Sequence, residues 1–324
     1  METDTQLELM ARAAALYYLE DVTQADVAER LGLSRVKVGR LLKRARETGI
    51  VEITVHAPAV LTERLEADIC ARFGVKHVLL GADHSDEALQ RELVVQRVGE
   101  YLLRHLHAGM TVAVGMGRNV AGVAASIRQA PARGCTFVPA IGGSPAVSRG
   151  VDAGDISRDM AERFGGAALG LFAPAYAETP AVRRAFLGHD DVRGALARAA
   201  AAQVAVVGIG DAENDSAVVR MGCFSQLDMI RMRQAGAVGD ILGSFFDQQG
   251  RPVAAGMGDR VVAIGAEDLH RIPCVIGVAA DPNKAPAILG ALRSGMLNVL
   301  ATSVANAREA LRLDDDEHEG VNRG

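Results

Sequence analysis

The chain has 324 residues, enough for one small and one large domain, and its 35 basic and 40 acidic residues give a net charge of −5. Any attraction to nucleic acid must therefore come from a local basic patch rather than from the average charge. The first ten residues, METDTQLELM, contain no apolar signal core, and the apolar runs elsewhere are shorter than a membrane span. We therefore expect a soluble, cytoplasmic protein with no membrane contact.

The cysteines support the same compartment. They are scattered singly through apolar surroundings, without the spacing of metal ligands or of a disulfide framework. The four are Cys70, Cys135, Cys223 and Cys274. We expect reduced thiols and no metal site.

Three helices are predicted within the first 48 residues. Residues 6–20 have helical spacing and helix-forming composition. Thr23 is a suitable N-cap for a short second helix, QADVAERL, which ends at Gly32, and Ser34 caps a third helix that runs to about Thr48. Two short helices joined by a glycine turn, the second of them basic, are typical of the helix-turn-helix motif.

The third helix is unusually basic. No acidic residue lies between Arg30 and Arg46, whereas a solvated surface helix normally alternates acids with bases. An amphipathic hairpin with a solvated basic face is the alternative, but an unneutralised field favours a polyanion as partner. In such a motif the start of the second helix enters the major groove. We expect base contacts from Arg35, Lys37 and Arg40, and phosphate contacts from Ser34, Lys43 and Arg44.

The pattern changes after the third helix. Residues 50–58, IVEITVHAP, alternate as a short strand and end at Pro58, so we place a DNA-binding domain at 1–57 and a second domain at 58–324. A linker helix, LTERLEADICARFG, opens the second domain. Eight apolar runs then alternate with helical segments: VKHVLLG, TVAVGMG, CTFVPAIGG, AALGLFAP, QVAVVGIG, RVVAIG, PCVIGVAA and LNVLATS. This alternation is typical of an α/β domain with a mainly parallel sheet covered on both faces.

A glycine-rich loop follows the second of these runs. VGMGRNVAG, residues 114–122, leads from a strand into a helix and would present backbone N–H groups to an anionic or hydroxylated ligand. It is not a dinucleotide fingerprint, because Val120 replaces the third glycine and no acidic residue ends the next strand. No phosphate-binding P-loop sequence is present either, so we expect no nucleotide cofactor. A tight turn without a ligand is the alternative interpretation.

Two later loops contain charged residues at positions suited to a ligand site. Asp240 and Asp247 lie near a predicted strand, and Lys284 lies at the start of a helix, where a lysine opposes the helix dipole. One lysine and one carboxylate near the strand ends would give a paired donor and acceptor for a hydroxylated ligand. For each residue taken singly, a solvated surface position remains open.

With these residues in place, the whole chain resembles the SorC family of bacterial transcription regulators. The resemblance is most specific at QADVAERLGLSRVKVGRLLKRARETGIVEI, GDILGSFFD and NKAPAILGALRSGMLNVLATS. It implies an effector domain similar to ribose-phosphate isomerases and glucosamine-phosphate deaminases, which binds a sugar, sugar phosphate or polyol. It also implies dimers or tetramers that bind double-stranded operator DNA of a carbohydrate or polyol catabolic operon.

The resemblance implies effector contacts, by position, at Gly115, Gly117, Arg118, Asn119, Gly142, Gly143, Asp240 and Lys284. Asp240 corresponds to an acidic residue that receives ligand hydroxyls, and Lys284 to a ligand-facing lysine. The chain departs from the family pattern at Met116 and Asn119, where tryptophan and threonine are usual, and Ile141 lies where several phosphosugar-binding members have a basic residue. A phosphorylated and an uncharged ligand both remain open.

A different class of function is also compatible with this fold. An aldose-ketose isomerase or deaminase would use Asp240 or Asp247 as base and Lys284 to polarise a carbonyl. A catalytic domain has little use for the basic stretch at 31–46, so we expect a regulator rather than an enzyme. A third possibility, a DNA-binding protein without a small-molecule input, leaves the glycine loops and Lys284 unexplained.

Overall fold

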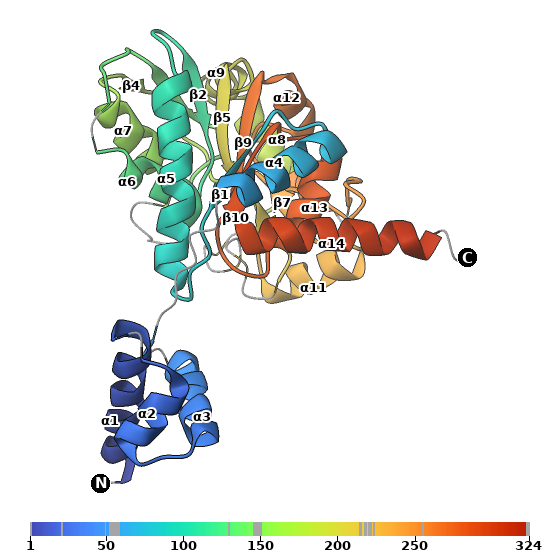
Figure 1. Cartoon of the computed structure of the whole chain (residues 1–324). Coiled ribbons are helices and arrows are strands. Elements are labelled where there is room, and N and C mark those ends of the chain that lie inside the picture. The colour runs from blue at the N-terminus through green and yellow to red at the C-terminus, as the bar shows by residue number, and fades with distance from the viewer. Residues whose placement is uncertain are drawn as a thin grey trace. The chain divides into compact units, whose positions relative to one another are not determined.

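The computed structural model describes residues 2–20, 22–48, 50–51, 59–128, 130–144, 151–213, 216, 219, 222, 224–254 and 256–321. The chain forms two compact units, Met1–His56 and Ala57–Gly324 (Figure 1). Each unit has its own buried apolar core. The division lies one residue from the boundary expected from the sequence.

The N-terminal unit consists of helices packed around a small apolar core. The helices are α1 (Glu2–Ala14), continued by the π-helical turn η1 (Ala15–Leu19), then α2 (Gln24–Leu31) and α3 (Arg35–Glu47). The first helix thus begins four residues earlier than predicted. Met10, Val27 and Val38 are among the buried side chains that join the three α-helices.

The ends of α2 and α3 confirm the predicted capping. The hydroxyl of Thr23 accepts a hydrogen bond from the backbone N–H of Asp26, and that of Ser34 accepts one from Lys37. Gly32 has a φ of +64°, the left-handed conformation that ends α2 and that glycine adopts without strain. Because these caps fix both ends of the connection, α3 follows α2 after a three-residue turn.

The C-terminal unit contains a seven-stranded sheet in which every paired neighbour is parallel, in the order β1-β10-β9-β5-β2-β3-β4. The strands are β1 (His77–Gly81), β2 (Thr111–Val114), β3 (Thr136–Pro139), β4 (Ala167–Ala168), β5 (Val204–Gly208), β9 (Cys274–Ala279) and β10 (Val299–Ser303). The parallel sheet confirms the predicted α/β class, because continuous apolar strands need cover on both faces.

Helices provide that cover. They are α4 (Ala59–Phe73), α5 (Glu87–His105), α6 (Arg118–Ser126), α7 (Ala153–Arg163), α8 (Pro180–Gly188), α9 (Asp190–Ala200), α11 (Gln226–Gln234), α12 (Ala266–Arg271), α13 (Ala285–Ser294) and α14 (Val304–Val321), with a 3-10 turn, η2 (Gly258–Arg260). Helices α5, α6 and α7 lie on one face, and α4, α9, α12, α13 and α14 lie on the other (Figure 1). Alternation along β1 shows the division: Leu79 packs into the first core, and Val78 and Leu80 into the second.

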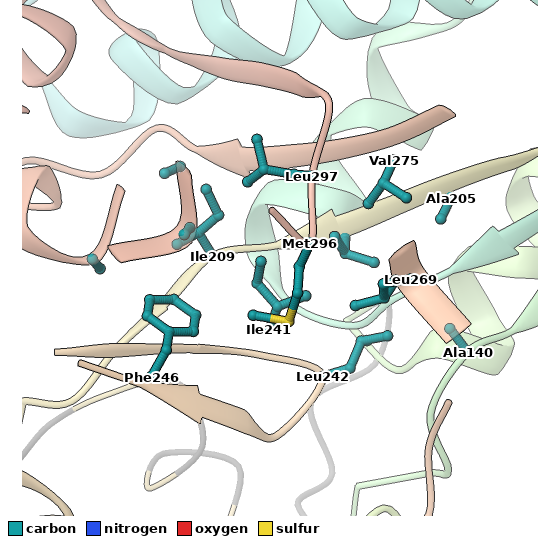
Figure 2. Close-up of a cluster of buried hydrophobic side chains, with 14 of the residues drawn as sticks. Ala140, Ala205, Ile209, Ile241, Leu242, Phe246, Leu269, Val275, Met296 and Leu297 are labelled. Carbon is teal, nitrogen blue, oxygen red and sulfur yellow. The ribbon is translucent and has the colours of Figure 1, made fainter. Parts of the chain in front are cut away.

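A small antiparallel sheet lies on the second face. It consists of β6 (Gly210–Asp211), β7 (Gly239–Ile241) and β8 (Ser244–Phe246). Ile241, Leu242 and Phe246 point from this hairpin into the buried cluster that also contains Met296 of the sheet domain (Figure 2). This packing holds the hairpin against the main sheet. It therefore also holds in place the polar residues on the opposite side of the hairpin.

Two of the eight predicted strands differ from the structure. RVVAIG forms no strand of the main sheet; instead Val261 and Ala263 make isolated antiparallel bridges to Tyr176 and Ile141. These partners lie in loops beyond the strand ends, so the segment is buried but has no parallel strand beside it. The hydrophobic periodicity of the sequence does not distinguish such a segment from a strand of the sheet. AALGLFAP contributes only the two residues of β4. Most of the strand predicted at 50–58 lies outside the described residues.

Two further properties concern the described residues alone. None of their helices is long and apolar enough to cross a membrane. They also contain no group of three His, Cys, Asp or Glu side chains arranged to hold a metal ion.

Candidate effector site

A cavity of about 330 Å³ opens at the carboxyl ends of β2, β5 and β9. The chain leaves β2 toward β3 on one side and leaves β5 toward β9 on the other, so the cavity lies at the switch point where ligands bind in open α/β sheets. Its volume suits a small metabolite. It is lined by Glu87, Met116, Gly117, Arg118, Asn119, Ile141, Tyr176, Gly208, Ile209, Gly210, Asp211, Glu213, Asp240, Gly243, Asp281, Pro282, Asn283 and Lys284.

The loop after β2 supplies the first wall. Gly117 is the N-cap of α6, with a φ of +108° that favours glycine, and it has no side chain to cap the helix. Asn119, in the first turn, is only 8% exposed. Its amide nitrogen lies 3.4 Å from a carboxylate oxygen of Asp281, while its carbonyl oxygen is buried without a hydrogen-bond partner among the described residues. Asn119 therefore has one acceptor available for a ligand.

The loop after β9 supplies the second wall. The carboxylate of Asp281 accepts a hydrogen bond from Arg91 of α5 at 2.6 Å and lies 3.7 Å from the guanidinium of Arg118. Burial alone would raise the pKa of this carboxyl, but the hydrogen bond from Arg91 and the charges of Arg91, Arg118 and Lys284 together lower it. The side chain of Asn306 donates to the backbone carbonyl of Asp281 at 3.0 Å, which fixes the loop. Asp281 is thus a firmly held anion.

Lys284 lies on the same loop and is buried at 7% exposure. Its ammonium group forms an ion pair with Asp211 of β6 and lies 3.5 Å from the backbone carbonyl of Ile209. The preceding residue, Asn283, has a φ of +60°, a conformation that asparagine tolerates better than most residues. The lysine therefore enters the cavity already bound to a carboxylate on the opposite wall.

Asp240 lies on the floor of the cavity, where β7 pairs with β6. It faces Gly210, and a Cβ atom at that position would lie 2.1 Å from a carboxylate oxygen of Asp240, so the glycine provides the space. The other oxygen accepts the backbone N–H of Gly243 at 2.9 Å. Burial raises the pKa of Asp240 to about 6, against the lowering effects of that hydrogen bond and of Lys284.

The structure brings together five of the eight predicted effector residues. Gly117, Arg118, Asn119, Asp240 and Lys284 all line the cavity. Gly115, Gly142 and Gly143 do not line it, although all three lie at strand ends nearby. A Cβ atom at residue 142 would lie 2.5 Å from the carbonyl oxygen of Ala173, so close packing explains that glycine. Asp247 also lies outside the cavity lining and pairs with Arg251 at 2.8 Å.

Several charged residues of the site, including the lining residues Glu87 and Glu213, are not among those predicted from the sequence. Asp211, Asp281 and Arg91 form the ion pairs that hold Lys284 and the β9 loop. Two of them carry a recognisable signal, because Asp211 and Asp281 follow the apolar runs VAVVGIG and VIGVAA directly, at the strand ends where ligand sites form. Arg91 lies within α5, where the sequence pattern gives no such indication.

In the N-terminal unit, all six residues predicted to contact DNA are exposed or partly exposed: Ser34, Arg35, Lys37, Arg40, Lys43 and Arg44. Between them, Val38, Leu41 and Leu42 are buried against the other helices. The first turn of α3 contains no acidic residue. The helix therefore presents a basic face on a fixed apolar base.

Known proteins match the chain across this architecture. A family model described as "Putative sugar-binding domain" matches residues 58–312. The transcriptional regulator LsrR of Klebsiella pneumoniae is 29% identical over 94% of this chain and 93% of its own. The crystal structure described as a "Putative Sugar-Binding Domain of Transcriptional Repressor from Vibrio fischeri" is 38% identical, covers 78% of this chain and 99% of its own, and superposes with a TM-score of 0.73.

A full-length relative extends the comparison to nearly the whole chain. The full-length sorbitol operon regulator SorC from Klebsiella pneumoniae is 28% identical, covers 93% of this chain and 97% of its own, and has a TM-score of 0.71. These matches place the chain among transcription regulators that contain a domain of this "Putative sugar-binding domain" family. The chain belongs to the SorC family of these regulators.

Proposed function

We propose that this protein regulates transcription of a carbohydrate or polyol catabolic operon, and that a sugar, sugar phosphate or polyol in the cavity alters its affinity for operator DNA. The observation that carries the proposal is the pairing, on one chain, of a basic helix with a cavity floored by Asp240 and walled by Lys284. A buried carboxylate and a buried ammonium on different walls can accept from and donate to the hydroxyls of one small ligand.

The basic helix α3 supports double-stranded DNA as the partner. Arg35 and Lys37 lie in its first turn, which in helix-turn-helix proteins reaches the base edges of the major groove. Arg44 lies in its last turn, where a long cationic side chain can reach a phosphate. Direct base readout is thus proposed for Arg35 and Lys37 at the start of the helix, and a phosphate contact for Arg44 at its end.

A continuous set of contacts supports coupling from the cavity toward the linker helix. α13 begins at the cavity with Lys284 as its N-cap and carries Arg293 in its last turn. Arg293 pairs with Asp314 of α14, and Asp314 also pairs with Arg72 of α4 at 3.2 Å. Because α4 is the first helix after the N-terminal unit, a shift of α13 on ligand binding would act on the connection to the DNA-binding unit.

We propose no catalytic role for the cavity. Proteins that match the chain over most of its length are named transcriptional regulators. Lys284 is held in an ion pair with Asp211, which opposes its use as a free amine. Asp247, the second candidate base, lies outside the lining. Incubating the protein with C4–C6 sugar phosphates and following them by nuclear magnetic resonance should show no turnover; conversion would revive the isomerase interpretation.

We also propose that the protein acts as a homo-oligomer, a dimer or tetramer, in the cytoplasm. One recognition helix reads one half-site, and two linked half-sites raise the effective concentration of the second helix. Residues 57–324 form a compact unit with their own cores, so this fragment should fold alone and retain self-association. Analytical ultracentrifugation tests this: a monomeric fragment beside an oligomeric full-length protein would place the interface in the N-terminal unit.

The regulatory proposal can be tested even though the operator sequence is undefined. Operator DNA is first selected from random-sequence fragments by the full-length protein. Its binding is then measured by fluorescence anisotropy with C4–C6 polyols, sugars and their phosphate esters. We expect at least one compound to change the operator dissociation constant, and Asp240→Ala to bind DNA as the parent does while losing that response.

The exposed carboxylate of Asp191 on α9 provides a matched control, since its side chain is 82% exposed and lies outside the cavity lining. Asp191→Ala should respond like the parent. If Asp240→Ala keeps the full response to the same compound, the effector site lies elsewhere.

A further inference from the structure

The charges around the cavity are unbalanced toward the acidic side. Among the described lining residues, two are basic, Arg118 and Lys284. Five are acidic: Glu87, Asp211, Glu213, Asp240 and Asp281. Each of the two cations already lies near one of these carboxylates, Lys284 against Asp211 and Arg118 against Asp281. An incoming anion would therefore have to compete with carboxylates of the protein for both positive charges.

A carboxylate of the protein lies close to the position best suited to an anion. The start of α6 offers backbone N–H groups and the positive end of a helix dipole, which would normally favour a phosphate. Here the carboxylate of Asp281 lies beside the first turn, 3.7 Å from the guanidinium of Arg118 and 3.4 Å from the amide nitrogen of Asn119. Asp281 is 18% exposed and is held by Arg91 at 2.6 Å, so it cannot turn away into solvent without breaking that bond. Its negative charge would repel a ligand phosphate placed at the start of α6.

Two acceptors of the cavity wall are buried and can be satisfied by a ligand. The carbonyl oxygen of Asn119 is buried without a partner among the described residues, and its amide nitrogen must face Asp281 because a carboxylate can only accept. Asp240 is likewise a buried carboxylate, with one of its oxygens bound to Gly243. A ligand that satisfies these groups must bring hydrogen-bond donors. Hydroxyls do so, whereas a phosphate dianion brings acceptors only.

We infer that the effector is an uncharged polyhydroxyl compound, an unphosphorylated sugar or polyol, and that Asp281 is the residue that excludes phosphate esters. This inference rests on the proposed function, since it specifies the ligand of the same cavity. Arg91 acts as a positioning residue, because it holds Asp281 and does not itself line the cavity.

The first test compares matched pairs of ligands on the full-length protein. Erythritol, xylitol, sorbitol and glucose are each paired with their terminal monophosphate, and affinities are measured by titration calorimetry. In any pair that binds, we expect the neutral member to bind at least about tenfold more tightly. In Asp281→Asn this preference should shrink about fivefold or more, because the resident charge is removed while a similar shape is kept. A phosphate ester that binds the parent more tightly than its neutral partner would overturn the inference.

The second test uses inorganic phosphate and so can be run before the effector is identified. At constant ionic strength, about 10 mM phosphate should not raise the Tm of the parent above that in chloride, whereas Asp281→Asn should gain phosphate-dependent stabilisation. Stabilisation of the parent that is lost in Arg118→Ala would show a phosphate subsite and contradict the inference. If no member of any pair binds and no compound changes the affinity for operator DNA, the proposed function fails. The comparison of phosphate with chloride still decides whether Asp281 excludes phosphate.

Discussion

Lys284, at the start of α13, is paired with Asp211, which lies on a separate strand 73 residues earlier in the chain. The pair closes one side of the cavity between the loop after β9 and the small antiparallel sheet. A lysine whose position opposes its helix dipole thus has an internal partner. A ligand therefore need not carry a negative charge to balance Lys284. It meets an ion pair with no net charge rather than an unpaired cation.

Lys284 and Asp211 should stabilise the folded state only when both are present. Lys284→Met leaves Asp211 without its partner in a partly buried position, and Asp211→Asn leaves the lysine unpaired, so each should lower the free energy of unfolding by about 2 to 4 kcal/mol. The double variant should be less destabilised than the sum of the two. A double-mutant cycle by urea denaturation measures this coupling. Lys76→Met, at the start of the sheet and outside the cavity, is the control for loss of a lysine. Strict additivity would show that the two residues do not interact.

Asp240 should make stability depend on pH. Its pKa is raised by burial to about 6 from the ordinary value of 3.8, so the folded state binds this proton more tightly than the unfolded state does. The stability gained from the protonated form is full below about pH 3.8 and is lost as the pH rises through about 6. Asp240→Asn lacks this loss, so at about pH 7.5 it should be more stable than the parent by roughly 2 to 3 kcal/mol, with little difference at about pH 4.

Calorimetric unfolding of both proteins between about pH 4 and 7.5 checks the Asp240 prediction. Asp191→Asn, at a side chain that is 82% exposed, should follow the parent at every pH. A constant offset between the parent and Asp240→Asn would contradict the assignment of the titration to Asp240.

The two ends of α3 should differ in their effect on DNA. Arg35→Ala should cost about 1 to 3 kcal/mol on the selected operator and relax its specificity at particular base pairs. Arg44→Ala should weaken binding to all sequences alike and reduce the salt dependence by about one phosphate contact. Anisotropy titrations on operator and random DNA at several salt concentrations distinguish these outcomes. Arg12→Ala, an exposed residue of α1, is the control. Equal losses on both DNAs for Arg35→Ala would mean that it contacts phosphate.

Asp314 should stabilise the contact between α4, α13 and α14. Its carboxylate is 3% exposed and accepts from both Arg72 and Arg293. Asp314→Asn should lower the free energy of unfolding by about 1 to 3 kcal/mol, because two guanidinium groups lose their shared charge partner. Asp316→Asn breaks a pair with Arg312 on the exposed side of the same helix and should change little. Equal effects of the two substitutions in urea denaturation would show that burial of Asp314 is unimportant.

Much of the fold can be predicted because its signals are local. Thr23, Gly32 and Ser34 are capping and turn residues whose backbone conformations follow from their own chemistry, and the structure confirms them. Seven of the eight apolar runs contain strands of the parallel sheet, because a short continuous apolar run is itself a local signal for a buried strand. The run at 260–265 departs from the prediction because its partners, Tyr176 and Ile141, lie in distant loops, and periodicity does not reveal which neighbour a strand will have.

The site is predictable only in part because its geometry is long-range. The loop at Gly117 and the charged residues Asp240 and Lys284 can be placed near strand ends from the sequence alone. The pairing of Lys284 with Asp211, and of Asp281 with Arg91, depends on how segments 73 and 190 residues apart converge, and no local pattern encodes it. These pairs decide the charge of the cavity, so a phosphorylated and a neutral ligand cannot be distinguished without the structure.

Regulation by a ligand in the cavity requires reciprocity between that ligand and DNA. A compound that binds the cavity and alters operator affinity by some factor must have its own affinity altered by the same factor when operator is bound. Titration calorimetry of the free protein and of the protein–operator complex, with the polyol that shifts operator binding most, measures both sides. We predict equal factors in the range of about 5 to 150, both falling to one in Asp240→Ala. A polyol that binds the cavity with the same affinity whether or not operator is present would show that the cavity does not regulate DNA binding.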